Sequence, residues 1–151
     1  MGKILLSTVF ILLDQISKLA VLKRLHQNES VPIINNIFHI TLVYNSGSAF
    51  GILRNQNWIL TYISVFAIVL IFFLLVRRPR FSSDLYLYLW QGALLLVLCG
   101  ATGNLIDRIR LGYVVDFLDF RIWPVFNFAD SMITSGVFIL LFLLFKKKAI
   151  E

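Results

Sequence analysis

The sequence predicts a membrane protein, mainly α, with four transmembrane helices in a bundle and a small β-sheet element with short connections on the outer face. Hydrophobic residues make up 59% of its 151 residues and charged residues only 15%, which is too apolar for a soluble protein of this length. The apolar residues also gather in four long runs, each near the ~20 residues that a helix needs to cross a membrane. We therefore expect a single integral membrane domain, 1–151.

The expected spans are about 4–22, 58–76, 85–102 and 126–145. Their ends carry basic residues: Lys3, Lys23-Arg24, Arg77-Arg78-Pro79-Arg80 and Lys146-Lys147-Lys148. This placement is typical of side chains that meet lipid head groups. A cleaved secretory signal is the alternative for the first run. No small-residue cleavage site follows that run, so we expect it to be retained as a span.

Between the first two spans, residues 23–57 form an extramembrane section that contains β structure. The stretch from Val31 to Tyr44 is rich in β-branched and aromatic residues, and Asn35-Asn36 interrupts it with a turn signal. We expect one or two short strands at the membrane surface. The section continues into Asn45-Ser46-Gly47-Ser48-Ala49-Phe50-Gly51, which local sequence alone would assign to an ordinary turn.

Charge and cysteine content limit the possible partners and cofactors. The net charge of +6 would suit a nucleic-acid-binding protein, but the basic residues lie at the ends of apolar runs, so lipid contact explains them better. Cys99 is the only cysteine, which excludes an intrachain disulfide and gives no support for a structural zinc site. His26 and His39 lack the paired spacing of a helical metal site. We expect membrane lipids as partners, no nucleic acid and no zinc site.

The orientation in the membrane follows less directly from charge. An even number of spans places both termini on one side, and counting Lys and Arg gives seven on that side and seven on the other. The basic triplets after the second and fourth spans lie on the terminal side, whereas the opposite cations are dispersed among acidic residues. This clustering favours cytoplasmic termini.

Two carboxyl groups stand out because each lies among apolar residues. Asp116 falls within Val114-Val115-Asp116-Phe117, and Asp130 follows Phe126-Asn127-Phe128-Ala129 at the start of the last apolar run. A carboxylate is costly to bury unless it is paired, neutralised or functional. When two carboxyls share a poorly solvated site, one can keep its proton while the other is charged. Such a pair supplies an acid and a base for peptide hydrolysis by water.

The two positions differ in their surroundings. The first turn of a helix favours negative charge, so we expect Asp130 to ionise before Asp116. Taken alone, Asp130 is better explained as a helix-start residue than as a catalyst. Asp116 is harder to explain without a function. Asp119, followed closely by Arg121, is expected to be an ordinary solvated residue or a cap.

Two further pairs have helical spacing. Asp14 and Lys18 are four residues apart, with the acid first, and should form a pair on an inward face of the first span. This pair either fixes the bundle or takes part in a site, and both interpretations remain open. Asn104 and Arg108 would share a face if the third helix continues beyond Thr102, although an isolated arginine here would normally extend to lipid head groups.

Five motifs occur in order along the chain: Asp14-Gln15-Ile16-Ser17-Lys18, Asn45-Ser46-Gly47-Ser48-Ala49-Phe50, Gly103-Asn104-Leu105-Ile106-Asp107-Arg108, Val114-Val115-Asp116-Phe117 and Phe126-Asn127-Phe128-Ala129-Asp130. In this order among four spans they resemble the bacterial lipoprotein signal peptidase (signal peptidase II) family, the aspartic peptidases of the cytoplasmic membrane. The resemblance covers nearly the whole chain. Ser46 and Ser48 depart from it, because Thr and Ala are more usual at those positions.

The resemblance implies the roles of individual residues. Asp116 and Asp130 would be the catalytic pair. The residues lining or supporting the site would be Asn45, Asn104, Arg108, Asn127, Asp14 and Lys18. Members of this family remove the signal peptide from diacylglyceryl-modified prolipoproteins just before the lipidated cysteine, and use no metal or cofactor. The resemblance further implies the bacterial inner membrane, a site toward the outer (periplasmic or extracellular) face and cytoplasmic termini.

Other functions are less consistent with the residues. A serine mechanism is disfavoured because Ser17 and Lys18 are adjacent and do not face each other on a helix, and Ser48 has no identifiable base beyond a distant His39. The serious alternative is a small four-span transporter or channel subunit with a polar internal path. It would explain Asp14, Lys18 and Arg108 without catalysis, and it predicts no hydrolysis.

Overall fold

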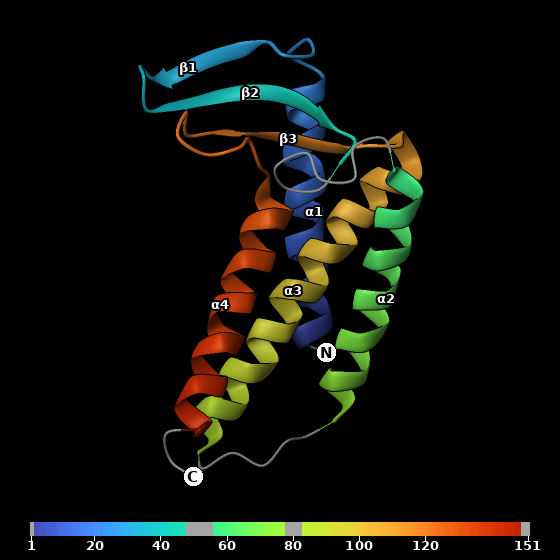
Figure 1. Ribbon diagram of the computed structural model, residues 1–151, viewed down its shortest axis with the longest axis vertical. Coiled ribbons are helices and arrows are strands. Elements are labelled where there is room, and N and C mark those ends of the chain that lie inside the picture. Colours follow the sequence, from blue (N-terminus) through green and yellow to red (C-terminus); the bar gives the residue numbers. More distant parts are fainter. Residues whose placement is uncertain (1, 48–55, 78–82, 149–151) are drawn as a thin grey trace.

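The computed structural model describes residues 2–47, 56–77 and 83–148. Within these residues, four helices are long and apolar enough to cross a membrane. They are α1 (Gly2–Leu22), α2 (Asn57–Val76), α3 (Asp84–Leu111) and α4 (Phe128–Lys148). The helices form a bundle, and a three-stranded sheet lies across one end of it (Figure 1). The predicted fold class, a four-helix membrane bundle with a small sheet, is confirmed.

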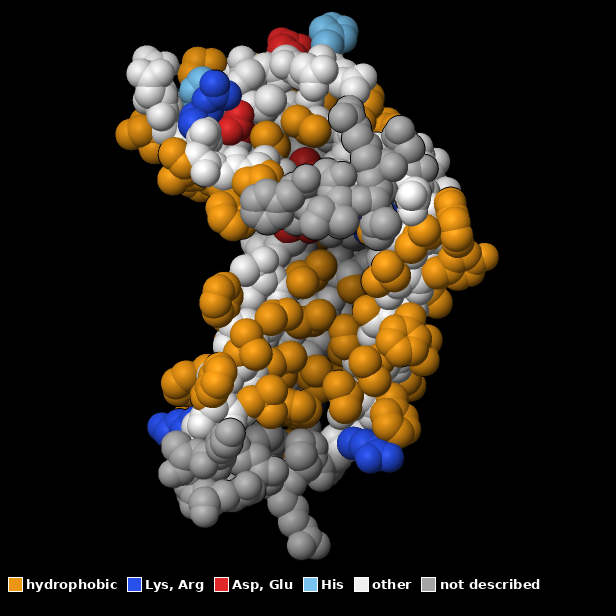
Figure 2. All heavy atoms as spheres, in the orientation of Figure 1, with side chains coloured by type: hydrophobic (Ala, Val, Ile, Leu, Met, Phe, Trp, Pro, Cys, Tyr) orange, Lys and Arg blue, Asp and Glu red, His pale blue; other side chains and the backbone are white. Residues whose placement is uncertain are grey.

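The outer surface of the bundle is hydrophobic around its middle. Large side chains such as Leu13, Phe66 and Phe138 are 56%, 70% and 68% exposed. Figure 2 shows such side chains as a broad band along the helices, with charged side chains above and below it. An apolar surface of this extent suits lipid rather than water. The helices therefore present a surface that a bilayer would cover.

Helices α3 and α4 approach closely because glycines lie between them. A Cβ added at Gly100 would lie 2.3 Å from the carbonyl oxygen of Ala129, and one at Gly136 would lie 2.6 Å from the carbonyl oxygen of Ala93. At Gly103 it would lie 2.5 Å from Oδ2 of Asp14 on α1. Small residues permit such contacts between membrane helices. Gly100 and Gly103 have this role, whereas an added Cβ at Gly92 meets nothing within 4 Å.

The sheet is antiparallel, in the order β1 (Ser30–Ile34), β2 (Phe38–Asn45), β3 (Val114–Asp119). The first two strands lie where the β-branched stretch predicts them. The third was not predicted: it joins β2 from a distant part of the chain, with Asp116 opposite Val43. The backbone N–H groups of Phe117 and Leu118 also donate to the carbonyl of Phe126, at 2.9 and 2.7 Å. These bonds hold the start of α4 beside β3.

Helix α3 continues beyond the expected end of the third span near Thr102. It ends at Leu111 and is capped by Gly112, which has a φ of 83° and whose N–H donates to the carbonyl oxygen of Arg108 at 3.1 Å. Glycine suits this left-handed position because it has no Cβ. Asn104 and Arg108 are therefore helical, and α3 carries them to the side of the bundle that bears the sheet. The part of the Asn45 motif from Ser48 onward lies outside the described residues.

Candidate active site

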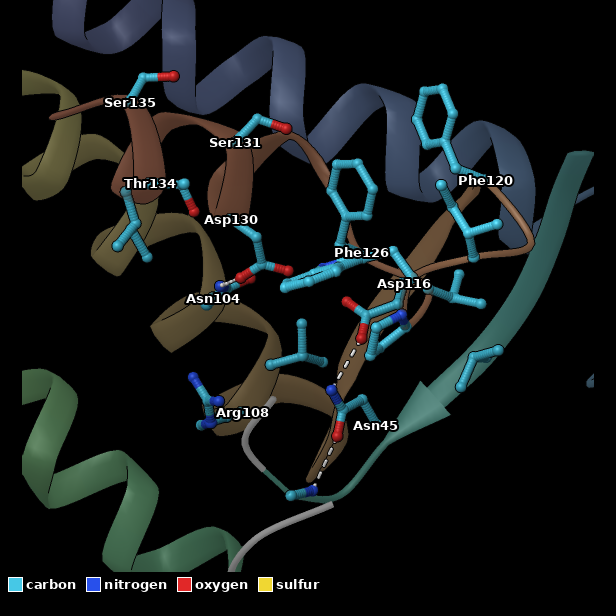
Figure 3. Close-up of a pocket in the computed structure, with 18 residues that line it drawn as sticks. Asn45, Asn104, Arg108, Asp116, Phe120, Phe126, Asp130, Ser131, Thr134 and Ser135 are labelled. Atoms are coloured by element: carbon cyan, nitrogen blue, oxygen red, sulfur yellow. Dashed lines mark hydrogen bonds between the residues drawn. The ribbon is translucent and has the colours of Figure 1, made fainter. Parts of the chain in front are cut away.

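A cavity of about 870 Å³ lies between the sheet, the segment that follows β3, and the adjoining ends of α3 and α4. Figure 3 shows side chains from all of these elements converging on it. Five of the residues predicted for the site line this cavity. They are Asn45, Asn104, Arg108, Asp116 and Asp130. The other three, Asp14, Lys18 and Asn127, are buried beside it, with exposed fractions of 0%, 2% and 0%.

Asp116 projects from β3 into a nearly closed environment and is 1% exposed. Asn45 donates from Nδ2 to its Oδ2 at 2.8 Å, and Asn127 donates from Nδ2 to its Oδ1 at 2.6 Å. Burial raises the pKa of Asp116 to about 7, with a further contribution from the negative charge of Asp130, while the two amide bonds act in the opposite direction. This carboxyl can therefore hold its proton near neutral pH.

Asp130 is the third residue of α4 and lies in the first turn of that helix. Its backbone N–H donates to Oδ1 of Asn127 at 2.9 Å, and its Oδ2 accepts from the backbone N–H of Asn127 at 3.3 Å. This reciprocal pair is a capping box. Asn104 also donates from Nδ2 to Oδ1 of Asp130 at 2.8 Å. The helix-start interpretation of Asp130 is correct, but the same side chain also faces the cavity.

Asn127 joins the two carboxyl groups. Its side-chain amide donates to Asp116 and its backbone N–H donates to Asp130. The antiparallel contact between Phe126 and β3 brings Asn127 to this point. Two aspartates that are separated along the chain thus line one cavity within the reach of a single asparagine (Figure 3).

Lys18 lies at the centre of a buried ionic cluster behind the cavity. Its Nζ lies 2.9 Å from Oδ2 of Asp14, 2.9 Å from Oδ2 of Asp107 and 3.0 Å from Oδ1 of Asn104. These contacts use all three donors of the ammonium group. Oδ1 of Asp14 accepts from the backbone N–H of Ala129 at 2.9 Å. The cluster therefore connects α1, α3 and the first turn of α4.

Two further members of this cluster, Asp107 and Gln15, were not predicted from the sequence. Asp107 is 3% exposed and accepts at Oδ2 from the backbone N–H of Val115 at 3.1 Å, so it positions the residue before Asp116. Gln15 donates from Nε2 to Oδ1 of Asp107 at 3.1 Å. The spacing could have indicated Asp107, because it follows Asn104 by three residues and so shares its helix face.

Arg108 lines the cavity but forms no ion pair among the described residues. It is half-buried and lies on the wall of the same cavity as Asp116 and Asp130 (Figure 3). A guanidinium with unused donors on a cavity wall can donate to a carbonyl oxygen of a bound molecule. Sequence spacing alone could not show whether Arg108 extends to lipid head groups or faces the cavity.

Asp119 is not the solvated residue of one prediction, but it does cap a turn, because its Oδ1 accepts from the backbone N–H of Arg121 at 2.9 Å. It is only 5% exposed, because β3 places it against Thr41 of the neighbouring strand. Thr41 donates from Oγ1 to Oδ2 of Asp119 at 2.7 Å, and Arg121 donates from its guanidinium to the same oxygen at 3.0 Å. Asp119 thus stabilises the sheet and does not line the cavity.

Comparisons with known proteins agree with this arrangement. The profile of the Signal peptidase (SPase) II family matches residues 6–146. The lipoprotein signal peptidase of Halothermothrix orenii is 46% identical over 142 residues, covering 94% of this chain and 94% of the relative. That of Clostridioides difficile is 44% identical over 146 residues, with 94% of each chain covered.

Solved structures show the same architecture. A bacterial membrane enzyme structure obtained by the in meso method at 2.3 Å resolution superposes with a TM-score of 0.90 and is 28% identical, covering 99% of this chain and 91% of that chain. A second such structure, at 1.9 Å resolution, gives a TM-score of 0.82 at 29% identity over 95% and 92% of the two chains. The chain belongs to the signal peptidase II family.

Proposed function

We propose that this protein is an aspartic endopeptidase that removes signal peptides from diacylglyceryl-modified prolipoproteins, cutting just before the lipidated cysteine. Family membership supports the substrate class. The observation that carries the chemistry is that Asp116 and Asp130 line one cavity and are joined by Asn127.

The surroundings of the two carboxyls support a division of roles. Asp116 is the more enclosed, and its pKa of about 7 lets it keep a proton. Asp130 lies at the N-terminal turn of α4, where the helix dipole favours a charged carboxylate. Asp130 is the base that takes a proton from the attacking water, and Asp116 is the acid that protonates the oxyanion or the leaving amine. No covalent intermediate forms.

The neighbouring amides hold this pair in place. Both oxygens of Asp116 accept from side-chain amides, and Asp130 accepts from Asn104. Preorganised carboxyls need little reorientation during the reaction. Arg108, which lines the same wall and makes no ion pair among the described residues, binds a substrate carbonyl oxygen.

The position of the cavity suits a substrate that is anchored in lipid. It lies between the sheet and the adjoining ends of α3 and α4, at the end of the apolar helices that bears the sheet (Figure 1). A precursor held by its signal helix and its acyl chains reaches this level by lateral movement. We further propose that the sheet lies on the outer side of the bacterial inner membrane and that both termini are cytoplasmic.

The alternative transporter or channel function is less consistent with the buried charges. Lys18 is enclosed by Asp14, Asp107 and Asn104, so its three donors are satisfied within the protein. A polar path would need charged groups that remain available to a passing solute. The cluster instead serves to position the cavity wall.

The test uses purified protein in detergent and a diacylglyceryl-modified precursor, with the product identified by mass spectrometry from its new N-terminal cysteine. The parent should cleave, while Asp116→Asn and Asp130→Asn should each lose nearly all activity yet unfold cooperatively on heating. Asn has nearly the same shape as Asp. In Asp130→Asn, the side-chain oxygen can still accept the capping hydrogen bond from the backbone N–H of Asn127. Survival of cleavage in either folded variant would defeat the catalytic assignment, and absence of cleavage by the parent would favour transport.

A further inference from the structure

Two hydroxyl side chains on α4, Thr134 and Ser135, line the cavity from within a helix that is long and apolar enough to cross a membrane (Figure 3). They follow Asp130 and Ser131 by four residues and therefore lie on the same helix face, one turn farther from the sheet. Both are exposed. The cavity wall thus continues from the carboxyl pair to a pair of hydroxyls at membrane depth.

These two hydroxyls differ from most others in the helices. A Ser or Thr within an apolar helix usually donates to a carbonyl of the preceding turn, which satisfies its proton. Such bonds are made by Thr8, Ser17, Thr61, Ser64, Thr102 and Ser131. In the part of the chain that the structure describes, neither Thr134 nor Ser135 makes one. Their donors are unused although they face an environment poor in water.

The substrate supplies acceptors at this depth. The last four carbonyl groups of any helix lack intrahelical donors, and a signal helix that ends near the scissile bond carries those groups into the cavity. A carbonyl left without a donor in lipid is costly, so a donor from the enzyme favours binding of the substrate. The ester carbonyls of the diacylglyceryl group are the other acceptors near the cleaved bond.

We propose that Thr134 and Ser135 form a hydrogen-bonding subsite for carbonyl oxygens of the substrate on the membrane side of the cleaved bond. The inference rests on the proposed function. Four residues of helix correspond to about 6 Å along the axis, so this subsite lies about two residues from the carboxyl pair along an extended substrate, or about four along a helical one. It binds the substrate and takes no part in proton transfer.

The variants are Thr134→Val, which replaces the hydroxyl with a methyl group of similar size, Ser135→Ala, and the double variant. Thr134→Ser retains a hydroxyl and should restore the parent behaviour. The matched control is Thr8→Val, because Thr8 is also an exposed threonine in a span, but its hydroxyl already donates to the carbonyl of Ile4. Cleavage kinetics are measured for each protein in detergent with the diacylglyceryl-modified precursor.

Each lost hydroxyl should raise KM about 3- to 10-fold while kcat stays near that of the parent, because a bond present in both the bound and transition states contributes equally to both. A precursor with ether-linked chains, which lacks ester carbonyls, separates the two acceptors. If Thr134 and Ser135 bind the ester carbonyls, the parent protein has a higher KM for the ether-linked precursor than for the ester-linked one. Thr134→Val and Ser135→Ala then raise the KM for the ether-linked precursor no further. If the signal-helix carbonyls are bound, the variants raise KM equally for both precursors.

The subsite is excluded if the double variant has a KM within twofold of the parent for both precursors, or if Thr8→Val has an equal effect. A fall in kcat at unchanged KM would also overturn it. In all of these cases, cleavage by the parent together with inactive Asp116→Asn and Asp130→Asn would leave the proposed function intact. Loss of cleavage by the parent itself would instead remove the function on which the subsite rests.

Discussion

Lys18 donates from Nζ to Oδ1 of Asn104 at 3.0 Å, and this contact fixes the orientation of an amide that faces the candidate active site. An ammonium group can only donate, so the oxygen of Asn104 must face it. The nitrogen of the same amide then faces Asp130, to which it donates at 2.8 Å. A buried lysine on α1 thereby determines which atom of α3 meets the proposed base on α4.

Replacing this lysine should destabilise the whole bundle. Lys18→Met keeps a long side chain but leaves Asp14 and Asp107 buried without their shared cation. Removing one partner of a buried ion pair typically costs about 3–5 kcal/mol. We expect a large fall in the thermal unfolding midpoint, measured in detergent, together with loss of cleavage.

Arg121→Met provides the control for that experiment. Arg121 also pairs with an aspartate, but its side chain is 49% exposed. Solvent screening reduces the contribution of such a pair to the free energy of unfolding to about 0–1 kcal/mol, so the unfolding midpoint should barely change. Equal destabilisation by the two substitutions would contradict the structural role assigned to Lys18.

The pH dependence of cleavage should report the protonation of Asp116. Burial and the nearby charge of Asp130 raise its pKa to about 7, so the acid is protonated below that pH and loses its proton above it. We expect kcat/KM to fall as the pH rises through about 7. Because the two carboxyls form a coupled pair, the apparent pKa of this falling limb of the pH profile belongs to the pair as a whole. A flat profile from pH 6 to 9 would exclude an essential acid with this pKa.

Asn45→Ala should move the same limb to higher pH. The amide of Asn45 donates to Oδ2 of Asp116, which lowers the pKa of that carboxyl, so removing the donor raises it. A shift of about one unit is expected for the loss of one bond to a charged group. Asn35→Ala, in the exposed turn between β1 and β2, is the control and should leave the limb in place. A shift toward lower pH would contradict the assignment of the acid.

Much of this architecture could be predicted from sequence, for reasons that are local. The apolar runs are long enough to identify helices, and Asp116 stands out because a carboxylate among Val and Phe residues is costly to bury. The capping role of Asp130 also follows from its place before an apolar run. These features depend on neighbours along the chain.

The remaining features depend on distant contacts. Strand β3 has no alternation between polar and apolar residues because both of its faces are covered, and only its pairing with β2 identifies it. Asp107 lies among polar residues that look like the end of a span, and its role requires Lys18 and Val115 to be nearby. The orientation of Arg108 depends on the cavity itself. Sequence spacing contains none of this information.

The contact between α3 and α4 gives a final prediction with a closely matched control. A methyl group added at Gly100 would lie 2.3 Å from the carbonyl oxygen of Ala129 and 2.7 Å from Cγ1 of Ile133. The first of these atoms is backbone and cannot turn aside, so the two helices must separate. Asn104 and Asp130 lie on these two helices, so their 2.8 Å bond would be strained as well.

Gly100→Ala should therefore lower both the unfolding midpoint and the rate of cleavage, while Gly92→Ala on the same helix should lower neither. An added methyl group at Gly92 meets nothing within 4 Å. Alanine also stabilises a helix interior by about 0.5–1 kcal/mol relative to glycine, so the second variant should be slightly more stable than the parent. Both proteins gain the same methyl group in α3, and only one gains it at the α4 contact. If Gly100→Ala unfolds and cleaves like Gly92→Ala, close packing of α3 against α4 is not what holds Asn104 next to Asp130.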